Sequence, residues 1–191
     1  MFYLIVILSS LLFTVAGNLL FIPNVADGYD ISIALAVTVA TVAVIIIDGL
    51  VALIIRRLTP QSWYLPSKPI FKVSKKERNF YRSLNIKSWK DLVPELGLFT
   101  GFSKSHLQST NDAKYLYRFI VESNYGVIIH LANAALGFLI AFIPFCSSPS
   151  IWIPVFAVNF ILSLMPVAVL RYTNHTLVAL YERSEKKKTV G

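Results

Sequence analysis

Four long apolar runs account for much of this 191-residue chain, and the residues outside them hold nearly all of its charge. The runs cover residues 3–21, 31–55, 125–145 and 151–170. A transmembrane helix needs about 20 mostly apolar residues to cross a bilayer. Apolar residues make up 55% of the chain and charged residues 15%, which argues against a soluble domain or a disordered chain. The sequence therefore predicts an all-α membrane protein with four transmembrane helices.

The first run also resembles the apolar core of a secretory signal peptide. No Lys or Arg precedes it, however, and it is longer than a typical signal core. We therefore expect it to stay as the first span, within a single integral membrane domain over residues 1–191. Cys146 is the single cysteine, which excludes an internal disulfide framework and a multi-cysteine metal site.

The basic residues predict the orientation of the spans. All 18 Lys and Arg residues lie in residues 56–118 or from Arg171 onward, and the other two loops contain none. By the positive-inside rule, loop 56–124 and tail 171–191 are cytoplasmic, so both termini lie on the cytoplasmic side of the cell membrane. The net charge of +8 then reflects topology and a bilayer with anionic headgroups. We expect no nucleic-acid partner.

The loop over residues 56–124 is too long to be a passive connection. Ser74 and Glu77 form a capping-box pattern that predicts the start of a helix. Phe80 and Leu84 follow with the i, i+4 spacing of an amphipathic helix, which we expect to break near Asn85. The loop is therefore predicted to be basic, partly helical and interfacial.

The remainder of the loop predicts two further boundaries. Pro94 and Gly97 are expected to end the first helical part. A second helix is expected to begin near Asp112 and to run into the third span. Trp63 and Tyr64, beside the end of the second span, are typical interfacial anchors.

Asp48 lies inside the second span, where an ionised carboxylate costs several kcal/mol unless it is paired or solvated. Such residues are functional candidates. The alternative is that Asp48 pairs with a nearby basic residue or lies near the headgroups. Gly49, next to it, would let another helix approach closely.

His130 lies in the third span, and Asn133 shares its helix face at i+3. A histidine titrates near neutral pH and can act as a general base. The alternative is a structural hydrogen bond from His130 to Asn159 or to a backbone carbonyl.

Glu122 precedes His130 by eight residues, about 12 Å along one helix, so the two side chains do not touch. Glu122 either helps to form a polar site or pairs with Arg118 at i−4. Arg171 follows the fourth span and either binds a phosphate or carboxylate group or anchors the helix at the interface.

Three groups of residues carry a family resemblance. The loop contributes Lys76, Glu77, Arg78, Tyr81, Leu84, residues 86–91, Pro94 and Gly97. The third span contributes Glu122, Ser123 and His130, and the end of the fourth contributes Pro166, Arg171, Tyr172 and Asn174. In these residues and in their order, the chain from about Pro69 onward resembles the glycosyl-4,4'-diaponeurosporenoate acyltransferase family.

This resemblance implies transfer of a fatty acyl chain to a sugar hydroxyl of a lipid-linked acceptor, such as a glycolipid or a glycosylated carotenoid. We expect His130 to take the hydroxyl proton, and Asn133 and Asn159 to orient it or to hold the oxyanion. Glu122 would orient the sugar or a basic partner. The predicted catalytic residues are therefore His130, Glu122 and Asn133.

Substrate binding is predicted for residues of the loop, the second span and the end of the fourth span: Asp48, Glu77, Arg78, Trp89, Lys90, Asp91, Arg171, Tyr172 and Asn174. Arg171 and the region of Lys87 and Lys90 would bind the phosphates of an acyl thioester donor. The donor is a co-substrate, and no metal or cofactor is expected.

Two other function classes are open at this point. A non-catalytic membrane scaffold would use the same polar residues to hold helices together and to associate with other membrane proteins. A transporter is disfavoured, because four short spans without visible inverted repeats would have to form a homo-oligomer.

Overall fold

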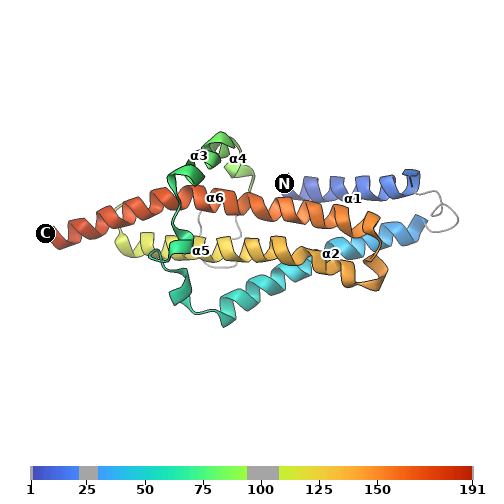
Figure 1. Ribbon diagram of the computed structural model, residues 1–191, viewed down its shortest axis with the longest axis horizontal. Helices are drawn as coiled ribbons and strands as arrows, with labels where there is room; N and C mark the ends of the chain where they lie inside the picture. The colour runs from blue at the N-terminus through green and yellow to red at the C-terminus, as the bar shows by residue number, and fades with distance from the viewer. Residues whose placement is uncertain (1, 22–29, 94–107, 191) are drawn as a thin grey trace. The chain divides into compact units, whose positions relative to one another are not determined.

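The computed structural model describes residues 2–21, 30–93 and 108–190, and all regular structure in these residues is helical (Figure 1). The α-helices are α1 (Phe2–Phe21), α2 (Asp30–Leu58), α3 (Lys75–Ser83), α4 (Ile86–Trp89), α5 (Ala113–Leu136) and α6 (Pro149–Val190). Short 3₁₀ helices are η2 (Gln61–Tyr64), η3 (Pro69–Phe71), η4 (Lys90–Leu92), η6 (Gly137–Phe142) and η7 (Pro144–Cys146). The predicted all-α class is confirmed.

Four helical segments are long and apolar enough to cross a membrane: Phe2–Phe21, Ser32–Leu58, Ala113–Phe142 and Pro149–Lys187. They correspond to the four predicted spans. The third and fourth differ in extent, because α5 begins at Ala113 and α6 continues past residue 170 to Val190. The predicted tail 171–191 is thus largely a continuation of α6. Hydropathy identifies the apolar part of a helix, whereas caps and breakers set its ends, and no Gly or Pro lies between Pro166 and Gly191.

The start of α5 agrees with the helix expected from Asp112. The Asp112 carboxylate accepts hydrogen bonds from the backbone N–H groups of Lys114 (2.9 Å) and Tyr115 (3.2 Å). It thereby satisfies N–H groups that have no partner inside the helix.

The chain forms two compact units, of which the first comprises Met1–Ile54 and His130–Leu164. Its core includes the small residues Ala36 and Ala40, which let neighbouring helices come close. The Tyr3 hydroxyl donates to the Leu162 carbonyl oxygen (2.9 Å). Large side chains such as Leu8, Leu12, Ile45 and Ile46 are exposed on its outside, as expected for helices that face lipid.

Gly137 is a glycine in this unit whose small size matters. A Cβ at this position would lie 2.6 Å from Nδ2 of Asn159 and 3.4 Å from the Phe156 ring. A Cβ on Gly49 has no neighbour within 4 Å, so no helix among the described residues uses the close approach that Gly49 would allow. The requirement for a small residue lies at the start of η6 instead.

The second unit comprises Ile55–Ile129 and Met165–Gly191. Here α5 and α6 run side by side, and the α3–α4 segment lies against α6 (Figure 1). Leu116, Phe119 and Ile120 of α5 pack with Leu177 of α6 in one buried cluster. A second buried cluster joins η2 and η3 to α5 and contains Tyr64, Phe71, Val121 and Tyr125.

The α3–α4 segment follows the predicted pattern. Ser74 caps α3, because its Oγ accepts a hydrogen bond from the backbone N–H of Glu77 (3.1 Å). The helix breaks at Asn85, which has φ 48°, a left-handed conformation that asparagine tolerates. Phe80 and Leu84 are exposed whereas Tyr81 is buried. The boundary expected at Pro94 and Gly97 lies outside the described residues.

We predict that Gly137→Ala destabilises the protein, because the new methyl group must displace Asn159 or shift a helix. Overpacking of this kind costs about 1–3 kcal/mol. The measurement is the midpoint of thermal unfolding of the purified protein in detergent. Gly49→Ala is the matched control and should leave the midpoint unchanged or raise it, since alanine favours a helix over glycine. Equal midpoints for the two variants would contradict the packing of Gly137.

Candidate functional site

Arg171 of α6 and Glu77 of α3 form an ion pair that organises the second unit. Nε and Nη2 of Arg171 donate to the two carboxylate oxygens of Glu77, the second at 3.0 Å. Nη1 donates to the carbonyl oxygen of Ile70 (2.9 Å) and Nη2 also to that of Lys72 (3.4 Å). The relative exposure of the two side chains is only 15% for Arg171 and 24% for Glu77. One guanidinium therefore holds the start of α3 and the residues before it against α6.

The electrostatics of Glu77 follow from this pair. Hydrogen bonding by Arg171 holds the pKa of the Glu77 carboxyl below its ordinary value, although partial burial opposes this. The Tyr81 hydroxyl also donates to Glu77 (3.0 Å). Burial, with the neighbouring Glu77 charge, raises the pKa of Tyr81 to about 12, so this hydroxyl stays protonated and acts as a donor.

A second contact between α3 and α6 joins Arg78 to His175, with Nη1 of Arg78 3.3 Å from Nε2 of His175. A guanidinium can only donate, so Nε2 of His175 is the acceptor and the ring proton lies on Nδ1. Consecutive residues of α3 thus contact residues one turn apart on α6, Arg171 and His175. His175 was not among the predicted site residues, although its i+4 spacing from Arg171 places it on the same helix face.

A buried chain of amides connects η2, α5 and α6. Nδ2 of Asn174 donates to Oδ1 of Asn124 (2.9 Å), and Nδ2 of Asn124 donates to the carbonyl oxygen of Tyr64 (2.8 Å). Both asparagines are fully buried. Oδ1 of Asn174 and Oγ of Ser123 are also buried and have no hydrogen-bond partner among the described residues. Since buried polar atoms are nearly always paired, these two have capacity for a further polar group.

Glu122 pairs with Arg56 at the end of α2, with Nη2 2.8 Å from Oε2. The Arg56 guanidinium lies 5.4 Å from the centroid of the Tyr125 ring, a cation–π contact. Tyr125 in turn stacks on Tyr64 with ring centroids 3.7 Å apart. A cavity of about 310 Å³ adjoins this cluster. Arg56, which lies 66 residues away in sequence, is thus one basic partner of Glu122.

The remaining predicted polar residues of the spans belong to the first unit. Nδ2 of Asn159 donates to the carbonyl oxygen of Asn133 (3.4 Å), and the Asn159 side chain also lies beside the Asp48 carboxylate. Oδ1 of Asp48 and Oδ1 of Asn133 are buried without a partner among the described residues. His130 is half-buried. The structure therefore brings together Asp48, Asn133 and Asn159.

The other predicted binding residues are more exposed. Nε1 of Trp89 donates to the Leu84 carbonyl oxygen (2.9 Å), which closes the turn between α3 and α4. Lys90 and Asp91 form a long 3.8 Å pair in which Asp91 is 90% exposed. Tyr172 is half-buried on α6. These residues do not share the buried hydrogen-bond network of Glu77 and Arg171.

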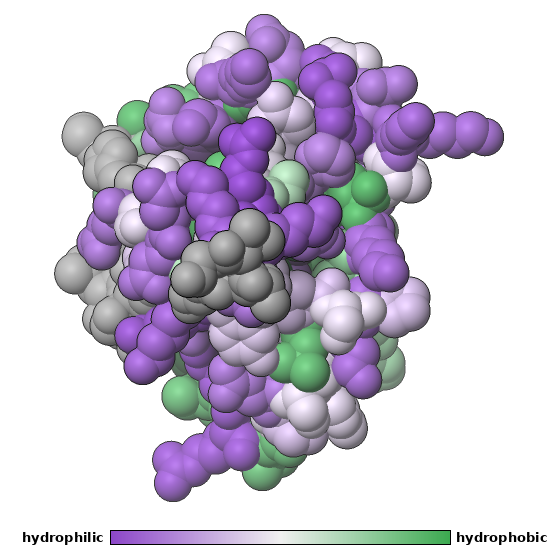
Figure 2. Space-filling view, turned by 90° about the vertical axis from the view of Figure 1, so that its left-hand side faces the viewer, coloured by the Kyte–Doolittle hydropathy of each residue, from purple (hydrophilic) through white to green (hydrophobic). Residues whose placement is uncertain are grey.

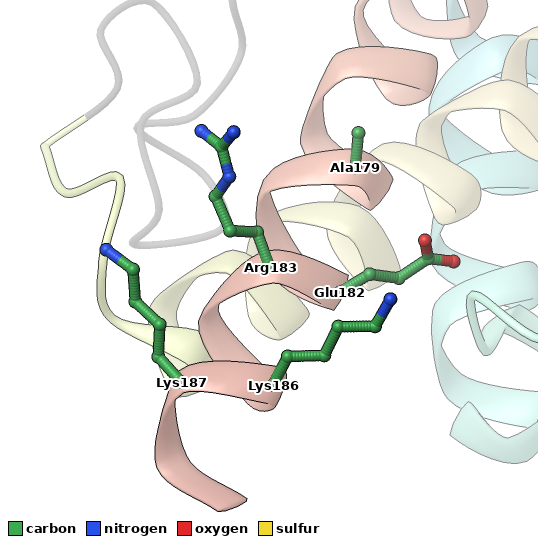
Figure 3. A pocket seen from close by; sticks show the side chains of 5 residues that line it. All are labelled: Ala179, Glu182, Arg183, Lys186 and Lys187. Carbon is green, nitrogen blue, oxygen red and sulfur yellow. The ribbon is translucent and has the colours of Figure 1, made fainter. Parts of the chain in front are cut away.

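The C-terminal half of α6 presents a basic surface. The face of the molecule at this end is mainly hydrophilic (Figure 2). A groove of about 460 Å³ runs along the helix and is lined by Ala179, Glu182, Arg183, Lys186 and Lys187. Arg183 and Lys187 extend to one side of the helix, whereas Glu182 and Lys186 extend to the other (Figure 3). All the residues that line this groove belong to one helix.

The ion pair between Glu77 and Arg171 gives a prediction for stability and its pH dependence. Glu77→Gln should lower the unfolding free energy at pH 7 by roughly 1–3 kcal/mol, because Arg171 then lacks its counter-charge. Since the folded state lowers the pKa of Glu77, the contribution is full above the ordinary value of 4.5. It is lost as the pH falls through the lowered pKa. The measurement is thermal unfolding between pH 7 and pH 3.

Asp91→Asn is the control for this prediction, because its exposed pair with Lys90 should contribute almost nothing. An equal loss of stability in both variants, or a loss in Glu77→Gln that persists unchanged at pH 3, would show that the ion pair is not the cause.

A family profile described as glycosyl-4,4'-diaponeurosporenoate acyltransferase (CrtO) matches residues 60–183. This range covers α3, α4, α5 and most of α6, including every residue of the network around Glu77, Arg171 and Asn174. No curated protein and no solved structure matches the chain. Since the profile covers more than half of the sequence, the chain belongs to the CrtO family of glycosyl-4,4'-diaponeurosporenoate acyltransferases.

Proposed function

We propose that the protein is an O-acyltransferase that moves a fatty acyl chain onto a sugar hydroxyl of a membrane-embedded glycolipid or glycosylated carotenoid. Membership of an acyltransferase family in carotenoid biosynthesis supports the reaction class. One structural observation carries the proposal further. Within the matched residues, Glu77 and Arg78 of the loop contact Arg171 and His175 of α6, next to the buried amide of Asn174.

In the proposed reaction, the acyl donor is a thioester. The acceptor oxygen forms an ester bond with the acyl carbon while the carbon–sulfur bond of the donor breaks. A general base takes the hydroxyl proton, which finally leaves with the thiol, so no further reactant is required. We assign the base to His130 and the orientation of the hydroxyl or the stabilisation of the oxyanion to Asn133 and Asn159.

The loop and α6 residues have different proposed roles. All three nitrogens of the Arg171 guanidinium already donate to protein acceptors, which favours a positioning role over phosphate binding for this residue. Arg78 positions His175 in the same way. Asn174 has an acceptor oxygen without a partner among the described residues and is proposed to bind a hydroxyl group. Asp48, Trp89, Lys90, Asp91 and Tyr172 stay proposed substrate contacts.

We place the reaction at the cytoplasmic side of the cell membrane, with both termini inside. The proposal rests on the complete confinement of Lys and Arg to the loop and the α6 end. The exposed Phe80 and Leu84 beside the basic residues of α3 suit contact with an anionic bilayer surface.

The decisive experiment compares membrane lipids by mass spectrometry in a strain that lacks the protein and in strains restored with each variant at equal protein level. Wild type should produce a glycolipid one fatty-acyl mass heavier than its precursor. His130→Gln should reduce this product at least about a hundredfold, as expected for loss of a general base. Lys114→Gln, which changes an exposed charge outside the proposed machinery, should match wild type.

His175→Gln separates the two histidines. As a positioning residue, His175 should give a smaller loss than His130. A product that disappears with His175→Gln but persists with His130→Gln would transfer the base role to His175. Identical lipids in the deletion and wild-type strains would instead favour the non-catalytic scaffold.

A further inference from the structure

The cavity beside the Arg56–Glu122 pair is built from three elements of the second unit. Arg56 comes from the last turn of α2 and Gln61 from η2. The other lining residues, at spacings i, i+3, i+4 and i+7 on one face of α5, are Arg118, Val121, Glu122 and Tyr125. The cavity volume of about 310 Å³ suits a small ligand or one polar group of a larger ligand.

The walls of this cavity are held in place before any ligand arrives. Arg56 is fixed by its 2.8 Å bond to Glu122 and by its position over the Tyr125 ring. Tyr125 is fixed by its stack on Tyr64, whose hydroxyl lies 2.7 Å from Oγ1 of Thr59. Preorganised walls reduce the entropy that a ligand loses on binding.

The charges favour an anion. Two guanidinium groups and one carboxylate line the cavity, so its formal net charge is +1. Nη2 of Arg56 donates to Glu122, and no other acceptor for Arg56 lies among the described residues. A guanidinium has five N–H donors, and its planar fork matches the geometry of a phosphate group. The Gln61 amide adds a further donor to the cavity lining.

The position of the cavity indicates which anions can reach it. Arg56 lies in the last turn of α2, a helix that is apolar enough to span a membrane. The end of such a helix lies at headgroup depth, where phosphate esters are the abundant anions. The groove along α6 in Figure 3 is also basic, but it lacks walls from a second element.

We propose that the cavity lined by Arg56, Gln61, Arg118 and Glu122 is a phosphate-binding site. The phosphate belongs either to a phospholipid headgroup or to a soluble phosphorylated acyl carrier such as coenzyme A. Arg118 and the unused edge of Arg56 contact the phosphate oxygens, while Glu122 holds Arg56 in orientation. The proposal concerns binding alone and does not require acyl transfer to take place.

The test uses the full chain, purified in neutral detergent and freed of lipid, with two probes. Coenzyme A is titrated by calorimetry, and binding of short-chain phosphatidylglycerol is followed by native mass spectrometry. Arg118→Gln should lower the affinity for the probe that binds at least about tenfold, which is the effect expected for loss of one charge-assisted hydrogen bond. Arg56→Gln should weaken it similarly.

Two matched controls lie outside the cavity. Lys114→Gln removes one positive charge one turn before Arg118, and Arg57→Gln removes one next to Arg56; both residues are exposed. Each should change the affinity less than about twofold. If Arg56→Gln fails to fold, Arg118→Gln carries the test, because Arg118 is exposed and its loss disrupts no core.

The probe that binds and responds to Arg118→Gln identifies the source of the phosphate. Failure of both probes to bind wild type overturns the proposal, as does equal weakening in the control variants, which would indicate diffuse electrostatics. The outcome is separable from the proposed reaction. Lost phosphate binding with a persisting acylated glycolipid refutes this site alone, whereas retained binding without that product refutes only the acyl transfer.

Discussion

The arrangement of the second unit depends on the contacts that the Arg171 guanidinium makes. It meets both oxygens of Glu77 and two backbone carbonyl oxygens, those of Ile70 and Lys72. A largely buried charge is tolerated only when its donors are paired. If the segment from η3 to α3 moved away from α6, Glu77 and Arg171 would each lose the counter-charge. The carbonyl oxygens of Ile70 and Lys72 would also lose their donor. The pair therefore holds the segment from η3 to α3 against α6.

The amide chain through Asn124 and Asn174 adds a second constraint within the same unit. Hydrogen bonds in a low-dielectric interior are strong when they are complete and costly when they are not. This network is incomplete, since Asn174 keeps an unpaired oxygen and Ser123 an unpaired hydroxyl among the described residues. A scaffold that used these side chains only to join helices would gain from complete pairing. Unfilled polar capacity at a buried position is instead typical of a site that binds a polar group.

The sequence predicted the positions of most helices but not which side chains pair between them. Apolar runs located the spans, and the capping box at Ser74 and the break at Asn85 located α3 and α4, because these signals are local. The extension of α6 beyond residue 170 was missed, since hydropathy does not report where a polar helix stops. Glu77 and Arg171 were both predicted as site residues, but their pairing across 94 positions was not. His175 was missed because its role follows from its contact with Arg78, and no sequence spacing predicts that contact.

Arg56 and Arg171, the two partly buried arginines that form ion pairs in the described part of the second unit, have different roles because their partners differ. Arg171 has every nitrogen of its fork matched to a protein acceptor, so a ligand would have to break existing bonds. Among the described residues, one nitrogen of Arg56 donates to a protein acceptor, and the guanidinium lies over the Tyr125 ring and beside the cavity. Displacing a satisfied donor offsets much of what a new hydrogen bond contributes, whereas an unused donor contributes its full net value. Ligand recognition should therefore concentrate at Arg56, while Arg171 keeps the framework in place.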